Sequence, residues 1–217
     1  MAVMNVNPTR MQLSKLKKQL TTAVRGHKML KDKRDELMRQ FLDLIRETRD
    51  LRDKVEAELE HCNAHFVNAS AVMSKEALDA ALLSPKQQIG VQIGSKNVMS
   101  VEIPQFETET RTADKGDIFP YGFAFTSFEL DDAVTSLDTV LPDLIKLAQY
   151  EKSCELMSAE IEKTRRRVNA LEYSTIPTLE ENIKYITMKL EENENSTKVR
   201  LLKVKDMVLQ KAHNYVQ

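Results

Sequence analysis

The sequence predicts a mainly α-helical protein, with a long antiparallel two-helix coiled coil formed by its N- and C-terminal helices and a small β-hairpin in the connector. Charged residues make up 30% of the 217 residues, and the chain has five glycines and no tryptophan, a composition typical of long helices. Heptad patterns fill both ends of the chain, and an alternating segment lies between them. We therefore expect a first helix over 1–84, a connector over 85–125 and a second helix over 126–217.

The first helix is predicted by the absence of breaks and by apolar spacing. Between Pro8 and Pro85 there is no proline and a single glycine, Gly26. Apolar residues recur in alternating steps of three and four, which places them on one stripe, the seam of a coiled coil. The seam residues are Leu13, Leu16, Leu20, Ala23, Leu30, Leu37, Phe41, Leu44, Leu51, Val55, Leu59, Cys62, Phe66, Ala69 and Met73. A helix over 8–83 would be roughly 110 Å long, so it needs a partner along its whole length.

The second helix has the same kind of seam. Thr126 and Glu129 have the spacing of a capping box, which predicts its start. Pro142 and Pro177 each remove a backbone hydrogen bond and are expected to kink or interrupt it. The seam residues are Leu130, Val134, Leu137, Leu141, Leu144, Leu147, Cys154, Met157, Ile161, Val168, Leu171, Leu179, Ile183, Ile186, Leu190, Leu201, Val204 and Val208.

A connector of about forty residues between two helices predicts antiparallel pairing. If the two helices pair with residue numbers that sum to about 216, Cys62 faces Cys154, and we expect two reduced, buried thiols. Residues 1–40 carry a charge balance of +7 and residues 195–217 one of +4, whereas the middle of the chain is acidic. Antiparallel pairing would place these two basic segments side by side at one tip.

The connector changes character at residue 85. Alternating apolar and polar residues on either side of 94–97 predict a β-hairpin with strands near 89–93 and 98–103. Residues 105–117 are polar and are expected to lack regular structure. The aromatic residues Phe119, Tyr121, Phe123 and Phe125 then alternate along the chain. Two interpretations stand: they plug the base of the coiled coil, or Phe119, Tyr121 and Phe123 dock another protein of a complex.

No motif predicts catalysis, a cofactor or a metal site. Residues 90–96 lack the spacing and the final Lys-Ser/Thr pair of a phosphate-binding loop. His61 and His65 lie one helical turn apart and could share a metal, but no third ligand is evident nearby in the sequence, so a structural role is favoured. The N-terminal residues contain no apolar run of signal-peptide length, and no segment is long enough to span a bilayer, which predicts a cytosolic protein.

Three consecutive arginines, Arg165, Arg166 and Arg167, lie between two seam positions of the second helix. With Ile161 at position a, they occupy e, f and g and point outward over about 200°. Composition alone favours an ordinary solvated face over a shaft that is contacted from several sides. Together with Lys17, Lys18 and Arg25 of the first helix, they are the basic candidates for an interface with other subunits.

Three long motifs carry a family resemblance: "NVNPTRMQLSKLKKQL", "RGHKMLKDKRDELMRQF" and "EIEKTRRRVNALEYSTIPTLEENIKYITMKLEENE". They closely resemble the D-subunit family of V-type (V/A-type) ATPases and ATP synthases, in its prokaryotic form with a short C-terminal end. The resemblance covers both long helices and therefore essentially the whole chain.

The resemblance implies a non-catalytic rotor shaft in the central stalk. Its terminal helices would penetrate the hexamer of catalytic A and regulatory B subunits, with the F subunit of the stalk bound to the shaft. Its base would meet the funnel-like subunit over the membrane ring. The complex would couple ATP hydrolysis or synthesis to proton or sodium transport. The chain itself would be a peripheral part of the complex, on the cytoplasmic side of the cell membrane. It would not bind nucleic acid and would not insert into the membrane.

Two other classes also fit parts of the sequence. A free coiled-coil binding module, such as a prefoldin-like chaperone subunit, has two long helices around a hairpin. A nucleic-acid-binding rod would use the basic tip, and its binding would fall steeply with salt. Identifying the proteins that co-purify with the chain would distinguish the rotor, the free binding module and the nucleic-acid-binding rod.

Overall fold

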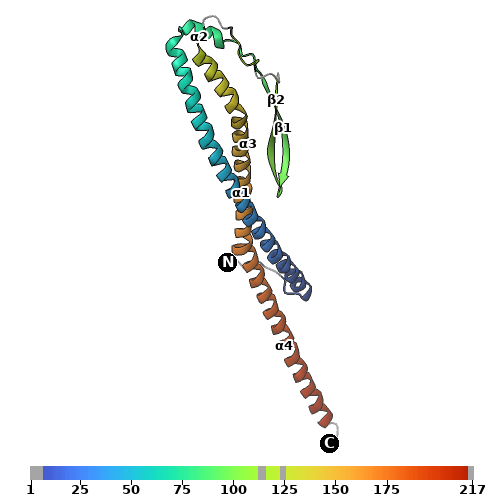
Figure 1. Ribbon diagram of the computed structural model, residues 1–217. Helices are drawn as coiled ribbons and strands as arrows, with labels where there is room; N and C mark the ends of the chain where they lie inside the picture. Colours follow the sequence, from blue (N-terminus) through green and yellow to red (C-terminus); the bar gives the residue numbers. More distant parts are fainter. Residues whose placement is uncertain (1–6, 112–115, 123–125, 215–217) are drawn as a thin grey trace. The chain divides into compact units, whose positions relative to one another are not determined.

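The computed structural model describes residues 7–111, 116–122 and 126–214, and it confirms the predicted fold class (Figure 1). Two long helical segments pack antiparallel, with a β-hairpin between them in the sequence. The elements in chain order are α1 (Arg10–Val72), α2 (Lys75–Leu82), β1 (Ile89–Val98), β2 (Val101–Thr110), α3 (Phe128–Ala170), the π-helical turn η1 (Leu171–Thr175) and α4 (Ile176–Asn214).

The chain divides into two compact units. We call residues 1–34 with 163–217 the terminal unit, and residues 35–162 the connector unit. Each unit contains an antiparallel helix pair: part of α1 with α3 in the connector unit, and part of α1 mainly with η1 and α4 in the terminal unit.

In the connector unit, contacts between α1 and α3 define the helix register. Cys154 Sγ lies 3.7 Å from Thr48 Oγ1, and the Cys62 thiol donates to the carbonyl oxygen of Ala133 at 3.3 Å. The expected pairing of Cys62 with Cys154 is therefore wrong. Both cysteines do lie in the helix interface as free thiols, with Cys62 buried and Cys154 half-buried.

The register differs because α1 ends about three turns before residue 83. Ser74 adopts an extended conformation and caps α2, with its Oγ accepting from the backbone N–H of Ala77 at 3.3 Å. The single helix expected over 8–83 is thus wrong beyond Val72. Because α1 turns back sooner, each of its residues faces an earlier residue of the second helical segment than we expected.

The predicted capping box at the start of the second helix is also wrong. Helix α3 begins at Phe128, and the Thr126 hydroxyl donates to the carbonyl oxygen of Gly122 at 3.1 Å. The Glu129 carboxylate lies against His65 of α1 instead. Two seam expectations fail nearby: Phe66 is 38% exposed and Leu137 is 47% exposed, whereas His65 is half-buried.

The predicted hairpin is confirmed, but its turn lies further along the chain. Strands β1 and β2 pair antiparallel from Val98 opposite Val101, and the two-residue turn is Met99–Ser100. Both turn residues have positive φ, as a tight hairpin turn requires, and the Asn97 side chain accepts from the N–H of Ser100. Residues 94–97, expected to be the turn, lie within β1. Residues 105–110, expected to be irregular, lie within β2.

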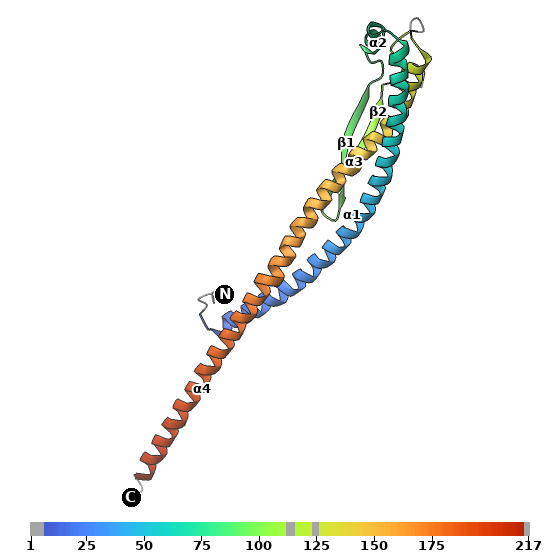
Figure 2. The same ribbon diagram turned by 90° about the vertical axis from the view of Figure 1, so that its left-hand side faces the viewer.

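Strand β2 fastens the hairpin to the helices of the connector unit. Val101 is buried in a cluster with Leu37, Met157 and Ile161, and Ile103 packs at its edge. The backbone N–H of Phe106 donates to the Gln149 side chain of α3 at 2.9 Å. This packing selects the register of the strands, because a one-residue shift would turn Val101 away from the cluster. Figure 2 shows the hairpin beside α3.

In the terminal unit, the seam closes around small and branched side chains. Thr164, Val168 and Ile186 are almost completely buried, and Leu16 of α1 is 6% exposed. Polar side chains flank this seam between α1 and the second helical segment: Arg10 forms an ion pair with Glu194, and His27 Nε2 lies 3.5 Å from the Glu172 carboxylate.

Pro177 follows a π-helical turn, which confirms that the regular α-helix is interrupted there. The N–H of Ile176 donates to the carbonyl oxygen of Leu171, five residues earlier, and the Thr175 hydroxyl donates to that of Ala170. The wider turn accommodates the missing N–H of proline without ending the helical segment. Pro142 lies inside α3, which continues through it.

The last part of α4 is not covered by α1. Arg10 pairs with Glu194, and α4 then extends beyond the start of α1 in Figures 1 and 2. The seam expected at Leu201, Val204 and Val208 is therefore wrong, since their exposed fractions are 63%, 49% and 59%. For the same reason the described basic residues at the start of α1 do not lie beside those of 195–214.

A cysteine crosslink tests the register of the connector unit. In Thr48→Cys, mild oxidation should join the new thiol to Cys154 within the chain, because the two side-chain atoms are already close. The wild-type chain should form no internal disulfide. Mass spectrometry of unreduced peptides measures both, and a Cys62–Cys154 disulfide in the wild type would contradict the register.

Candidate partner-binding surfaces

The three arginines form an outward arc on α3 in the terminal unit. Thr164 and Val168 on either side of them are 1% and 2% exposed, whereas Arg165, Arg166 and Arg167 are all exposed. The predicted outward orientation is confirmed. Because adjacent residues on a helix differ by about 100°, the three guanidinium groups face different directions. A flat partner on one side cannot engage all three at once.

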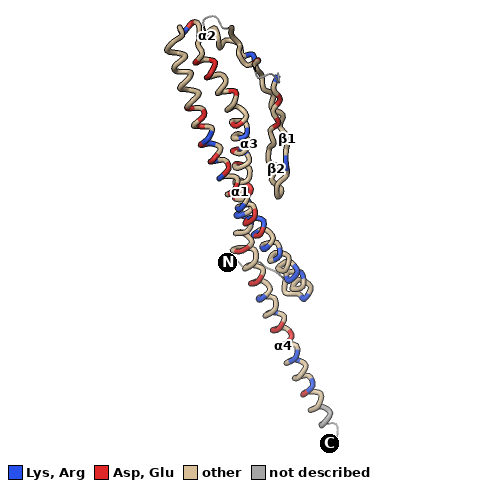
Figure 3. The backbone as a smooth tube through the Cα atoms, in the orientation of Figure 1, with Lys and Arg blue, Asp and Glu red and all other residues tan. Residues whose placement is uncertain are grey.

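A second basic surface lies on the N-terminal part of α1. Figure 3 shows Lys and Arg concentrated along this stretch of the helix. Lys17 and Lys18 line a shallow groove together with Arg10 and Leu13. Lys18 also borders a groove that reaches Thr175 of η1 and Leu179 of α4. Arg25 is exposed on the same helix.

The end of α4 carries exposed apolar side chains, three of which, Leu201, Val204 and Val208, were expected on the seam. All residues of 191–210 are exposed. The large apolar ones are Val199, Leu201, Leu202, Val204, Met207, Val208 and Leu209, interleaved with Lys198, Arg200, Lys203 and Lys205. An uncovered set of this size is typical of a surface that binds another protein. Sequence reasoning missed it because the heptad pattern continues into it without a change.

Two of the alternating aromatic residues, Phe119 and Tyr121, are held by contacts within the connector unit. Tyr121 packs against the cluster of Ala69, Ala81 and Leu130, and its hydroxyl donates to the Asp131 carboxylate at 2.9 Å. The Phe119 ring lies 6.0 Å from that of Tyr121. These contacts favour the interpretation that the rings plug the end of the helix pair. Phe123 lies outside the described residues.

Burial and the Asp131 carboxylate both act on Tyr121. Each disfavours the phenolate, so the pKa of Tyr121 is raised above its ordinary value. The phenol therefore keeps its proton, and its hydrogen bond, over the whole neutral range.

Charged pairs on the exterior join α1 to α3. Lys54 Nζ lies 2.6 Å from Asp143, and their hydrogen bond lowers the pKa of the Asp143 carboxyl and raises that of Lys54. A second pair joins Arg52 to Glu151. Lys54 and both members of the second pair are substantially exposed, so water screens these interactions and each contributes modestly. Across the described part of the chain, no helix combines the length and the apolar character that crossing a membrane requires.

Comparisons with known proteins agree on one family. The family model for the D subunit of ATP synthase matches residues 12–206. The V-type ATP synthase D subunit of Acetivibrio thermocellus is 58% identical over 215 residues, covering 99% of this chain and 97% of the relative. The V-type ATP synthase D subunit of Clostridium botulinum (strain ATCC 19397 / Type A) is 58% identical over 214 residues, covering 98% and 99%.

The Tyr121 hydroxyl offers a measurable contribution to stability. Tyr121→Phe should lower the free energy of unfolding by about 1 kcal/mol at neutral pH, because Asp131 loses its donor. Since the pKa of Tyr121 is raised in the folded state, this contribution is present below about pH 10 and lost as the pH rises through the folded pKa.

Urea unfolding at neutral and alkaline pH measures the effect. Tyr173→Phe is the matched control, because Tyr173 is 70% exposed and should tolerate the change. Equal stability of Tyr121→Phe and the wild type at neutral pH would show that the hydrogen bond contributes nothing.

Proposed function

Because the chain belongs to the D-subunit family of ATP synthases and thus to the V-type ATPase complex, we propose that it is the rotor shaft in the central stalk of that complex. It has no catalytic role of its own. It transmits rotation between the nucleotide-hydrolysing or synthesising hexamer and the membrane part, which moves protons or sodium ions.

The observation that carries this proposal is the pairing of helices in both units. A shaft must resist twisting, and two helices joined along an apolar interface do so better than one. Val55 of α1 and Met157 of α3 are 2% exposed, while charged pairs such as Lys54 with Asp143 lie on the exterior of the same helices. Exposed charges suit a surface that meets successive partners, because each screened pair contributes at most about 1 kcal/mol.

The two units are suited to different partners within the complex. We assign the terminal unit to the hexamer of catalytic A and regulatory B subunits. Its contacts there would be Arg165, Arg166, Arg167, Lys17, Lys18, Arg25 and the exposed apolar residues of α4. Phe119, Tyr121 and Phe123 of the connector unit would lie toward the funnel-like subunit, and the F subunit would bind along the stalk. The chain would be a peripheral part of the complex on the cytoplasmic side of the membrane.

Single-molecule rotation tests the proposal directly. A bead is attached to Lys96→Cys on the exposed hairpin, and the hexamer of the assembled complex is fixed to a surface. Adding ATP should turn the bead in one direction. A stationary bead on complexes that hydrolyse ATP and retain the chain would refute the rotor role, whereas a chain that never purifies with a hexamer would favour a free binding module.

Charge reversal tests the arginine arc. Separate Arg165→Glu, Arg166→Glu and Arg167→Glu variants should fold normally, because each side chain is exposed. We expect those that meet the hexamer to weaken assembly by up to about tenfold at low salt, and less at high salt. Affinity and ATP turnover are measured separately. Lys96→Glu, on the hairpin, is the matched control, and three arginine variants that behave like it would show that the arc does not contact the hexamer.

A further inference from the structure

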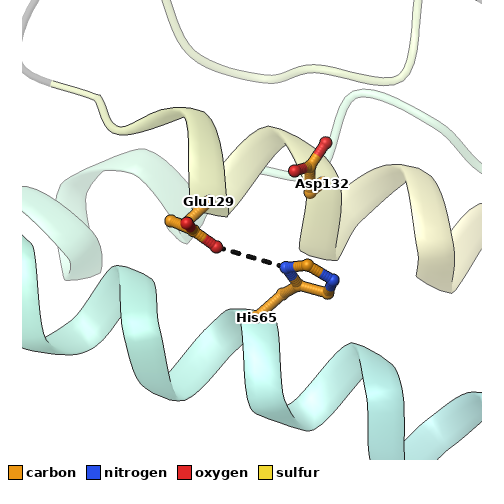
Figure 4. A group of neighbouring side chains, drawn as sticks. All are labelled: His65, Glu129 and Asp132. Carbon is orange, nitrogen blue, oxygen red and sulfur yellow. Dashed lines mark hydrogen bonds and ion pairs between the residues drawn. The ribbon is translucent and has the colours of Figure 1, made fainter.

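We propose that His65, Glu129 and Asp132 form a binding site for a divalent transition-metal ion, with Zn²⁺ as the ion it takes (Figure 4). His65 comes from α1, and the two carboxylates come from the first turns of α3. The site lies within the connector unit, and its ion would join the two helices near the end of α1. This role is independent of the proposed rotor function.

The positions of the ligand atoms suit a small metal ion. His65 Nδ1 lies 3.2 Å from Glu129 Oε2, and one ligand atom from each of the three residues lies within 4.8 Å of the others. Ligand bonds of about 2.0–2.2 Å in a tetrahedral zinc site place neighbouring ligand atoms about 3.4 Å apart. One edge of the tetrahedron is therefore already at the required spacing. The other edges need at most about 1.4 Å of closure, which side-chain rotation can supply.

The helix packing brings these residues together and holds them there. Glu129 and Asp132 are three residues apart, so they lie on one face of α3. The adjacent Cys62–Ala133 hydrogen bond and the buried contact between Ala69 and Leu130 fix that face against α1. Ligands on two packed helices are positioned more rigidly than ligands on loops, which favours metal binding.

An ordinary structural explanation accounts for only part of the cluster. Acidic residues in the first turn of a helix are stabilised by its dipole, and a His65–Glu129 hydrogen bond needs no metal. It does not account for Asp132, whose carboxylate has a ligand atom within 4.8 Å of those of His65 and Glu129. A divalent ion bound by all three residues would give this third side chain a role.

The ligand set selects the class of metal. One imidazole nitrogen with two carboxylate oxygens suits Zn²⁺ and neighbouring transition metals. Mg²⁺ and Ca²⁺ prefer six or more oxygen ligands and are disfavoured by the nitrogen. Three protein ligands leave a fourth position for water, so we expect moderate affinity. His65 would bind as the neutral imidazole through Nδ1, with the proton on Nε2.

His61 offers a matched control. It lies one turn before His65, and the two rings are 4.5 Å apart in an edge-to-face arrangement. It is exposed and is not one of the three residues whose ligand atoms gather at the site. Replacing it removes a neighbouring histidine but leaves the proposed ligand set complete.

Zinc titration of the untagged, full-length chain tests the proposal. After chelator treatment and removal of the chelator, calorimetry should show one Zn²⁺ per chain. The melting temperature should rise by about 5–10 °C at a hundred times the dissociation constant. His65→Ala, Glu129→Gln and Asp132→Asn should each weaken binding at least tenfold, and His61→Ala less than twofold. Mg²⁺ at the same concentration should leave the melting temperature unchanged.

Several outcomes would overturn the proposal. If the wild-type chain does not bind Zn²⁺ saturably with a stoichiometry of one ion per chain, the proposal is wrong. Equal loss of binding in His61→Ala and His65→Ala would assign the ion to another ligand set. A sulfur-to-cobalt charge-transfer band in the Co²⁺ form would assign it to a cysteine such as Cys62. Circular dichroism of each metal-free variant separates lost ligands from lost folding.

Discussion

The apolar stripe of α1 is the constraint on which the rest of the structure depends. A helix of 63 residues with a continuous stripe cannot bury it by folding on itself, so a second helix must cover it. In the connector unit α3 does this, and in the terminal unit mainly η1 and α4 do. Leu37, Val55 and Ile186 are almost completely buried as a result. The second helical segment meets this requirement along α1, and the end of α4 that extends beyond α1 stays exposed.

The hairpin depends on the same helix pair. An isolated two-stranded hairpin is only marginally stable in water. Here one face of β2 completes an apolar cluster that the helices begin, while most of β1 remains exposed. The connector is therefore not an independent domain, since its core belongs to the two helices. Loosening the helix pair around Leu37 and Met157 would free the hairpin as well.

Long-range periodicity made the helices, their antiparallel pairing and the outward arginines predictable. Features set by one or two residues were not. Helix α1 ends at Val72 and Ser74 caps α2, with no proline or glycine in the sequence to mark this break, so the register that follows from it could not be read from the heptads. The cluster of His65 with Glu129 and Asp132 depends on this register. Sequence spacing therefore identified His65 as a possible ligand but not the two carboxylates from the other helix. The hairpin turn was misplaced because turn-forming composition at 94–97 competed with the packing of Val101.

The π-helical turn has a consequence for how the length of the chain can vary. A strict heptad count continued from Val168 places 175, 178, 182 and 185 on the seam. Asn182 is buried as that count requires, whereas Thr175 is exposed and Ile186 is more deeply buried than Tyr185. The hydrogen bond from Ile176 to Leu171 spans one residue more than an α-helical hydrogen bond, so a turn of this kind can hold one extra residue without rotating the faces that follow. Elsewhere in the second helical segment, a single-residue insertion would rotate all later side chains by about 100°. Within η1, by contrast, deletion of one residue would convert the π-helical turn to ordinary α-helix. The side chains of α4 would then keep their present orientation.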